Sequence, residues 1–259
     1  MKKDYIRAKS GEVDEIQFVE KYWTDVWEKL GGPKGLTTRI FKQDEYRLIK
    51  PFLERLPPNN KVVDGGCGLG DWVLALGSQN LNVVGVDISK QVINKLKEIY
   101  PEHEFQDGDI RSLDIPDATI DAYYSWGVFE HFESGPQDCL REAMRVLKPG
   151  GYLFITVPFE NFRHSILGSL AKYRKTQKDL RFYQYRFTRA ELALEFDIAG
   201  FEIVDVKPIH KRQGALRSLH HEFGLSYEWR ITKVIAFVLA LVLPSWTIGH
   251  MVMGIGRKR

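Results

Sequence analysis

Three glycines at alternate positions form a loop that must lie close to a ligand. Gly66, Gly68 and Gly70 follow the short apolar run "KVV". A dinucleotide-binding fingerprint, Gly-x-Gly-x-x-Gly, would need its third glycine where Asp71 stands. Two carboxylates flank the loop, Asp64 and Asp71, and they would repel a phosphate at a helix N-terminus but attract a positive centre such as a sulfonium. The loop therefore favours a cationic nucleoside over a dinucleotide.

Two further acidic residues lie at the ends of the next two predicted strands. Asp87 ends "NVVGVD" and Asp109 follows "EFQDG". In open parallel sheets, ligands lie beyond the carboxyl ends of the strands, where the strand order reverses. Asp87 is placed there to accept hydrogen bonds from ribose hydroxyls, and Asp109 could accept one from an exocyclic amine. Simpler roles stay open, namely helix capping for Asp87 and an Asx-turn for Asp109.

The elements that must position these residues alternate between strand and helix. Amphipathic spacing predicts helices over 13–30 and 40–55 before this alternation begins. Ser89 is placed to cap the helix that follows the second strand, and Thr188 forms a capping box with Glu191. Strand–helix alternation predicts an α/β fold with a doubly wound, mostly parallel sheet. The predicted strands cover residues 61–66, 82–89, 104–110, 120–126, 152–158, 201–209 and 250–258.

A single domain is expected to contain all these elements. We divide it into a helical N-terminal extension (1–58), a cofactor-binding core (59–158), a basic lid-like insertion (159–187), a return to the core (188–209), an apolar helical insertion (210–249) and the last strand (250–259).

The ordered motifs resemble the class I S-adenosylmethionine-dependent methyltransferases, in the branch that acts on small-molecule or lipid-type acceptors. The resemblance covers residues 40–210 and the last strand. It rests on "VVDGGCGLG", "VVGVDIS", "DGDIRSL", "IDAYYSWGVFEHF", "LKPGGYLFITVP" and "FTRAELALEFDIAGFEIV". It implies S-adenosylmethionine as cofactor and a Rossmann-like sheet with a reversed last strand.

The same resemblance assigns cofactor contacts to the residues that follow successive strands. The glycine loop would contact the methionine part, Asp87 the ribose, and Asp109 the adenine edge. Ser125 and Trp126 would lie near the sulfonium. The cofactor-binding residues so implied are Asp64, Gly65, Gly66, Cys67, Gly68, Gly70, Asp87, Ile88, Asp109, Ile110, Ser125 and Trp126. For Cys67, a role as a small filler is favoured over that of a nucleophile.

A hydroxyl acceptor needs its proton removed during methyl transfer, and His131 in "FEHF" is the candidate base. A structural histidine at a helix start is the alternative, and Glu130 is a weaker candidate. His164 and Tyr183 could reach the pocket only if the 159–187 insertion folds over it. Some quinone-pathway relatives carry a metal-binding acidic residue earlier in this motif. Gly127 and Val128 stand there in this chain, so no metal is predicted.

Composition restricts where such a chain can work. With 44% hydrophobic and 27% charged residues, a packed core is expected rather than global disorder. Two cysteines cannot form a disulfide framework and fit a reducing compartment. Residues 1–12 contain no apolar run, so no secretory signal is expected. These observations predict a cytoplasmic protein, with membrane association left open.

The segment 163–189 combines eight basic residues and one acid with interleaved aromatic residues. Cationic grooves with stacking aromatics bind RNA, so an RNA methyltransferase is one alternative. A solvated lid whose aromatic side chains cover the core is favoured. The residues "SWGV" after the fourth strand also lack the (Asn/Asp)-Pro-Pro-aromatic motif of amino-directed nucleic-acid methyltransferases.

The stretch 231–249 has no charged residue after Lys233. Pro244 divides it, so its helical part is too short to span a bilayer. A buried helix, a dimer seam and a membrane-surface anchor remain open. Together with the basic segment, it favours methyl transfer to oxygen or nitrogen of a small hydrophobic or lipid-linked acceptor with an anionic head. The alternatives are RNA methylation and a cofactor-binding protein without turnover; the oligomeric state is left open.

Overall fold

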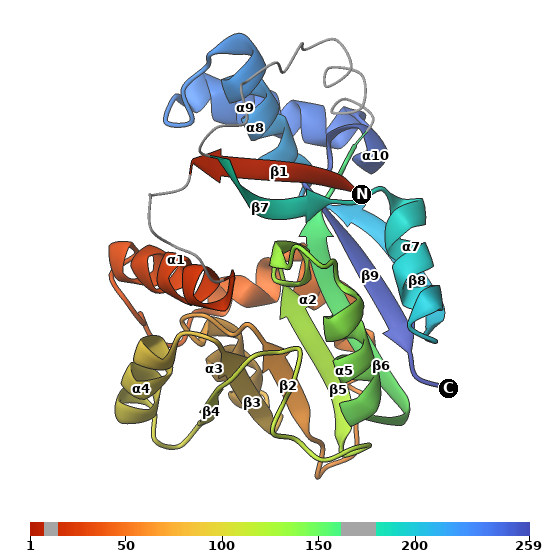
Figure 1. Cartoon of the computed structure of the whole chain (residues 1–259). Coiled ribbons are helices and arrows are strands. Elements are labelled where there is room, and N and C mark those ends of the chain that lie inside the picture. The colour runs from red at the N-terminus through yellow and green to blue at the C-terminus, as the bar shows by residue number, and fades with distance from the viewer. Residues whose placement is uncertain (8–14, 162–179) are drawn as a thin grey trace.

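The protein is represented by a computed structural model that describes residues 1–7, 15–161 and 180–259. Its centre is a seven-stranded sheet in the order β4-β3-β2-β5-β6-β9-β8 (Figure 1). Strands β2 to β6 run parallel, and β9 runs antiparallel to both β6 and β8. The expected Rossmann-like sheet with a reversed last strand is therefore confirmed. The strands are β2 (Val62–Gly65), β3 (Val83–Asp87), β4 (Glu104–Asp107), β5 (Ile120–Trp126), β6 (Leu147–Pro158), β8 (Glu202–Ile209) and β9 (Met251–Arg257).

Alternate residues of the central strands face two different layers of helices. Val62 and Tyr124 pack in one core with α2 (Asp44–Leu53), α3 (Asp71–Gly77) and α4 (Lys90–Ile99). Val63 and Tyr123 pack in the other core with α5 (Gln137–Val146) and α7 (Arg189–Ile198). Both faces of the sheet are covered, as expected for a doubly wound fold. The crevice at the switch point therefore opens beyond the carboxyl end of β2, where the glycine loop begins.

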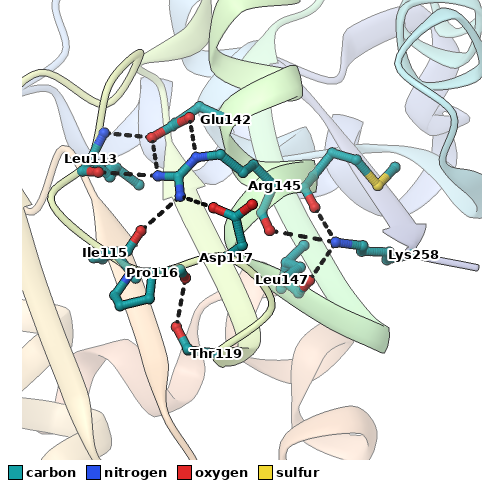
Figure 2. A network of polar contacts seen from close by, with 10 residues as sticks. Leu113, Ile115, Pro116, Asp117, Thr119, Glu142, Arg145, Leu147 and Lys258 are labelled. Atoms are coloured by element: carbon teal, nitrogen blue, oxygen red, sulfur yellow. Dashed lines mark hydrogen bonds and ion pairs between the residues drawn. The ribbon is translucent and has the colours of Figure 1, made fainter.

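A polar network holds the long connection from β4 to β5, which carries two of the predicted cofactor residues. Arg145 of α5 donates hydrogen bonds to the carbonyls of Leu113 and Ile115, at 3.1 and 2.8 Å (Figure 2). Lys258, directly after β9, donates to the carbonyl of Leu147 at 2.7 Å and so caps the end of α5. The loop is thus tied to the same helix as the last strand of the sheet.

The sequence predicted a helical N-terminal extension, but part of this extension is a β-strand. It begins with β1 (Lys2–Arg7), which pairs antiparallel with β7 (Leu180–Arg186) in a separate two-stranded sheet. Because this pairing joins segments far apart in the chain, no local sequence pattern predicts it. The helical part consists of α1 (Glu15–Lys29), the short 3-10 helix η1 (Thr38–Lys42) and α2. The single helix expected over 40–55 is therefore divided. Of the basic insertion, residues 162–179 lie outside the described residues.

Two predicted helix caps have different outcomes. The capping box at Thr188 is confirmed, since its side chain and that of Glu191 bond each other's backbone N–H groups. Ser89 stands at the start of α4, but its side chain caps nothing. Its Oγ instead lies 2.6 Å from Oγ1 of Thr24 on α1. The Ser89 side chain thus makes a contact between two helices instead of the predicted capping hydrogen bond.

The apolar insertion forms a small helical unit. It consists of α8 (Lys211–Phe223), α9 (Arg230–Val242) and α10 (Ser245–Ile248), gathered at one end of the molecule beyond the β1–β7 pair (Figure 1). Ala215, Leu219, Ala236 and Ile248 form its core. Within the described ranges, none of the helices has both the length and the apolar character needed to cross a membrane.

Candidate active site

The glycine loop between β2 and α3 adopts a backbone that other residues would strain. Gly66 has φ 80° and Gly68 has φ 52°. A Cβ on Gly66 would lie 2.4 Å from Cγ2 of Val128, and one on Gly68 would lie 2.7 Å from Cζ2 of Trp27. The loop therefore needs glycine both for its conformation and for the close approach of neighbouring side chains.

Asp87 joins the glycine loop to the end of β3. Its Oδ2 accepts a hydrogen bond from the Gly68 N–H and its Oδ1 accepts one from the Ser89 N–H, each at 2.9 Å. Burial raises the pKa of this carboxyl, and the two N–H bonds oppose the rise. The carboxylate therefore positions the loop, while its remaining lone pairs are free to accept from a ligand.

A cleft of about 610 Å³, counted with its open mouth, lies beyond the carboxyl ends of β2, β3 and β5. It brings together seven of the residues singled out in the sequence: Gly66, Asp87, Ile88, Asp109, Ile110, Trp126 and His131. We call it the larger cavity. Its other lining residues had no assigned role: Val19, Trp23, Trp27, Gly108, Gly127, Val128 and Phe132.

The two carboxylates that flank the glycine loop do not line this cavity. Asp64 is 2% exposed, and burial raises its pKa well above the usual range. Asp71 lies on the first turn of α3. Neither side chain is therefore in direct contact with this cavity, and their attraction for a cation stays a prediction. Asp87 is the carboxylate that reaches the cavity from this region.

The remaining predicted cofactor residues belong to the strands and the loop next to the cavity. Ser125 donates from Oγ to the carbonyl of Gly65 at 2.5 Å and ties β5 to β2. Burial raises the pKa of the Cys67 thiol well above its usual range, consistent with a filler rather than a nucleophile. Gly65 is the last residue of β2, and Gly70 directly precedes α3. None of these residues lines the cavity.

Asp109 lines the cavity but already has a partner. Its carboxylate accepts from Arg111, with Nε 3.0 Å from each oxygen and a further guanidinium bond at 2.6 Å. Arg111 also reaches Glu15 of α1 at 3.3 Å. The carboxylate is thus held in a bidentate pair, which fixes its orientation at the cavity edge.

Helix α1 forms a wall of the larger cavity that the sequence analysis did not anticipate. Val19, Trp23 and Trp27 recur at four-residue spacing and so share one face of the helix. The Trp23 and Trp27 rings stack with centroids 5.3 Å apart. The four-residue spacing of these three apolar side chains in the sequence was the feature that could have predicted this wall.

His131 sits between two aromatic rings at the edge of this cavity. Its ring centroid is 5.1 Å from that of Trp23 and 5.0 Å from that of Tyr183. Nδ1 lies 2.7 Å from the carbonyl oxygen of Tyr183. Because a carbonyl only accepts, Nδ1 carries the proton and Nε2 keeps its lone pair. Burial lowers the pKa of His131 to about 4, so the imidazole is neutral at neutral pH.

Glu130 is buried next to His131 and differs from an ordinary surface carboxylate. Its side chain is 2% exposed, and Oε1 lies 3.9 Å from Nε2 of His131. Burial raises the pKa of Glu130 to about 8. At neutral pH its carboxyl is therefore mostly protonated, and it could ionise beside a positive imidazolium. A catalytic role for Glu130 stays a prediction.

A second, smaller cavity of about 400 Å³, again with its mouth, lies on the other side of His131. Val19, Trp23 and His131 line both cavities. The smaller cavity is mainly aromatic, with Arg181 and two glutamates at its edge. Tyr183 of β7 lies here, while His164 falls outside the described residues. The full lining is Glu15, Phe18, Val19, Tyr22, Trp23, His131, Glu133, Arg181, Phe182 and Tyr183.

Among residues 1–7, 15–161 and 180–259, no group of three or more His, Cys, Asp or Glu side chains is arranged to hold a metal ion.

Comparison with known proteins supplies the context for this geometry. Residues 63–155 match the family described as Methyltransferase domain. A probable S-adenosylmethionine-dependent methyltransferase of Mycolicibacterium smegmatis is 25% identical over 206 residues, covering 78% of this chain and 75% of that protein. The ubiquinone biosynthesis O-methyltransferase of Coxiella burnetii is 26% identical over 183 residues, covering 68% of this chain and 76% of that protein.

A solved structure shares the fold over nearly the whole length. The geranyl diphosphate C-methyltransferase of Streptomyces coelicolor, with Mg²⁺, geranyl diphosphate and S-adenosyl-L-homocysteine, aligns with a TM-score of 0.60 at 12% identity. The alignment covers 97% of this chain and 100% of that one. At this identity the likeness shows the common architecture.

Proposed function

Because the chain belongs to the class I S-adenosylmethionine-dependent methyltransferases, we propose that its larger cavity holds this cofactor and its smaller cavity receives the methyl acceptor. The observation that carries the proposal is the position of His131, which lines both cavities. A side chain on that shared wall can contact an acceptor atom while the acceptor approaches the methyl donor.

The larger cavity has features that fit the cofactor. The indole N–H groups of Trp27 and Trp126 are buried without a hydrogen-bond partner among the described residues, and both side chains line the cavity. Buried donors need acceptors, which the carboxylate of the methionine part could supply. Indole rings also attract a cation such as a sulfonium. The Asp87 carboxylate would accept from the ribose hydroxyls, with Ile88 and Ile110 against the adenine.

The cofactor supplies a methyl group on a good leaving group, so the protein's main contribution is positioning and exclusion of water. We assign to His131 the removal of the acceptor proton. Its Nδ1–H bond to Tyr183 orients the ring so that the Nε2 lone pair is the free base. The proton would pass from the acceptor oxygen or nitrogen to Nε2, and the imidazolium would lie beside Glu130. Glu130 would then release its own proton to solvent, and its carboxylate would offset the charge of the imidazolium.

The acceptor is proposed to be a small hydrophobic or lipid-linked molecule that is methylated at oxygen or nitrogen. The aromatic lining of the smaller cavity suits an apolar body. One of the compared proteins supports this class by name, through its part in ubiquinone biosynthesis. A membrane that presents such an acceptor would be a partner consistent with the apolar insertion.

RNA is a weaker candidate because the described arginines of the basic segment are engaged within the protein. The Arg181 guanidinium lies 4.1 Å from the ring centroid of Phe18. Arg186 pairs with Asp4, and Arg189 donates to the carbonyl of Val206 at 2.9 Å. These side chains therefore do not form an open basic groove in the described part of the segment.

The proposal is tested with cofactor that carries a labelled methyl group, incubated with a cell extract and the protein. We expect label in the organic-soluble fraction that ribonuclease does not remove. His131→Ala should lower the rate roughly 100-fold or more while cofactor affinity changes little. His103→Ala is the control, because that histidine lies at the amino end of β4, away from both cavities.

Ribonuclease-sensitive label would favour the RNA alternative, and label in water-soluble products would exclude a lipid-like acceptor. Equal rates for His131→Ala and the wild-type protein at neutral pH would reduce His131 to a structural residue. Cofactor binding without product in any extract would favour the alternative of a cofactor-binding protein without turnover.

A further inference from the structure

The outer face of α9 is apolar and exposed along its whole length. Ile231, Val234, Phe237, Val238, Leu241 and Val242 are between 49% and 68% exposed. Their spacing of three and four residues places them on one stripe of the helix. Surface helices normally carry polar side chains on this side, so a continuous apolar stripe marks a contact surface.

The opposite face of α9 already accounts for the folding of this unit. Thr232 and Ala236 are fully buried there, and Ile235, Leu239 and Leu243 pack against the core formed with α8 and α10. The outer stripe therefore adds nothing to the packing of the three helices. Its apolar side chains need another explanation.

Charged and aromatic residues frame the stripe. Arg230 is exposed four residues before Val234, so it continues the stripe at its amino end. Trp229 precedes the helix and Trp246 follows it, and these side chains are 53% and 49% exposed. No acidic residue occurs from Trp229 to the last residue, Arg259. The nearest carboxylate, Glu228, pairs with Lys233 at 3.5 Å.

This combination matches a helix that lies in a lipid–water interface. Such helices bury apolar side chains at the headgroup–acyl boundary, with Trp and cationic residues at its level. At about 1.5 Å per residue, the 13 residues of α9 reach about 20 Å, less than a hydrocarbon core of about 30 Å. A second copy of the chain fits less well, because the stripe offers no carboxylate to pair with Arg230 across an interface.

We propose that the outer face of α9 docks on the surface of a membrane rich in anionic lipids, with its axis in the membrane plane. The apolar stripe enters the headgroup region, and Arg230 contacts lipid phosphates. Docking does not depend on methyl transfer. Membrane binding can therefore be absent while the proposed methyl transfer holds, and membrane binding can be present while the proposed methyl transfer fails.

The arrangement of the neighbouring helix connects this surface to the smaller cavity. Helix α8 packs directly against α9. Burial raises the pKa of Tyr183 in the smaller cavity, and the charge of Arg217 on α8 is near enough to oppose that rise.

The test is sedimentation of the full-length protein with vesicles of phosphatidylcholine, alone or with about a third phosphatidylglycerol. We expect binding to the anionic vesicles that weakens in high salt and is weaker on the neutral ones. Val234→Glu/Leu241→Glu should lower the binding constant at least about tenfold. The matched control is Leu194→Glu/Ile198→Glu, which alters two apolar side chains of α7 with similar exposure, 56% and 62%.

Two further measurements test whether the variants are folded and whether Arg230 contributes to lipid preference. Cofactor affinity, measured by calorimetry, shows that each variant is folded. Arg230→Glu, a milder change, should remove the preference for anionic vesicles. The proposal is overturned if the wild-type protein binds neither vesicle, or if the α9 and α7 variants bind equally. It is also overturned if the wild-type protein is a dimer that only the α9 variant dissociates, since the face would then be a dimer seam.

Discussion

At the scale of single residues, Asp87 links the glycine loop to the sheet. Its two oxygens accept from the N–H groups of Gly68 and Ser89, so one side chain fixes the loop and offers lone pairs to the cavity. Both tasks follow from its place at the end of β3, where parallel strands open their crevice.

We predict that Asp87→Ala weakens cofactor binding by about 1.5–3 kcal/mol, because charge-assisted hydrogen bonds are lost. Calorimetric titration with S-adenosylmethionine measures this. Asp107→Ala is the control, since Asp107 pairs with Asp87 in the β3–β4 register but is exposed. Asp87→Asn separates the loss of charge from the loss of shape. Unchanged affinity in a folded Asp87→Ala protein would remove Asp87 from the cofactor site.

At the scale of elements, α1 is the cover of the larger cavity. It is attached to the core by Thr24 to Ser89, at 2.6 Å, and by Glu28 to Gln91, also at 2.6 Å. Trp27 then lies against the glycine loop. A helix from outside the sheet therefore completes a site whose other walls follow β2, β3 and β5.

We predict that Trp27→Phe weakens cofactor binding roughly tenfold, because the ring remains but the unpartnered indole N–H is lost. Trp27→Ala should cost more, since the wall itself is removed. The same titration gives both values. Trp229→Phe serves as the control, because that indole is exposed on the apolar unit. If Trp27→Phe binds the cofactor like the wild-type protein, the indole N–H has no cofactor partner.

At the scale of the whole molecule, a partly buried ion pair joins the part of the chain around the large sheet to the unit of α8, α9 and α10. The His210 ring Nε2 lies 2.9 Å from Oε1 of Glu45 in α2. Burial alone would lower the pKa of His210, but the Glu45 carboxylate raises it above the usual value. The pair therefore favours the charged imidazolium in the folded protein.

This pair makes stability depend on pH. A histidine whose pKa is raised by folding adds stability below its unfolded pKa, about 6.5, and that contribution is lost as pH rises through the folded value. We predict that urea unfolding gives a lower free energy at pH 8.5 than at pH 6. Glu45→Gln should reduce the dependence and cost about 1.5–3 kcal/mol at pH 6. An unchanged pH profile in Glu45→Gln would show that other groups cause it.

The sequence by itself determined the alternation of strands and helices in the core and the residues at the carboxyl ends of the strands. These follow from local apolar periodicity and from turn residues such as Gly66 and Gly70, which act within a few positions of the chain. The reversed last strand was implied by the family resemblance. The cofactor class followed from the same motifs. Seven of the residues singled out in this way line the larger cavity.

Only the tertiary structure decided which side chains cover that cavity and which ionisable groups around it carry a charge. The β1–β7 pair and the Trp27 contact join segments distant in the chain, which no local pattern specifies. Burial, a property of the packed fold, raises the pKa of Asp64 and Glu130 and lowers that of His131. The apolar run 231–249 was evident in the sequence, but which of its side chains face α8 and which face outward depends on how α9 packs.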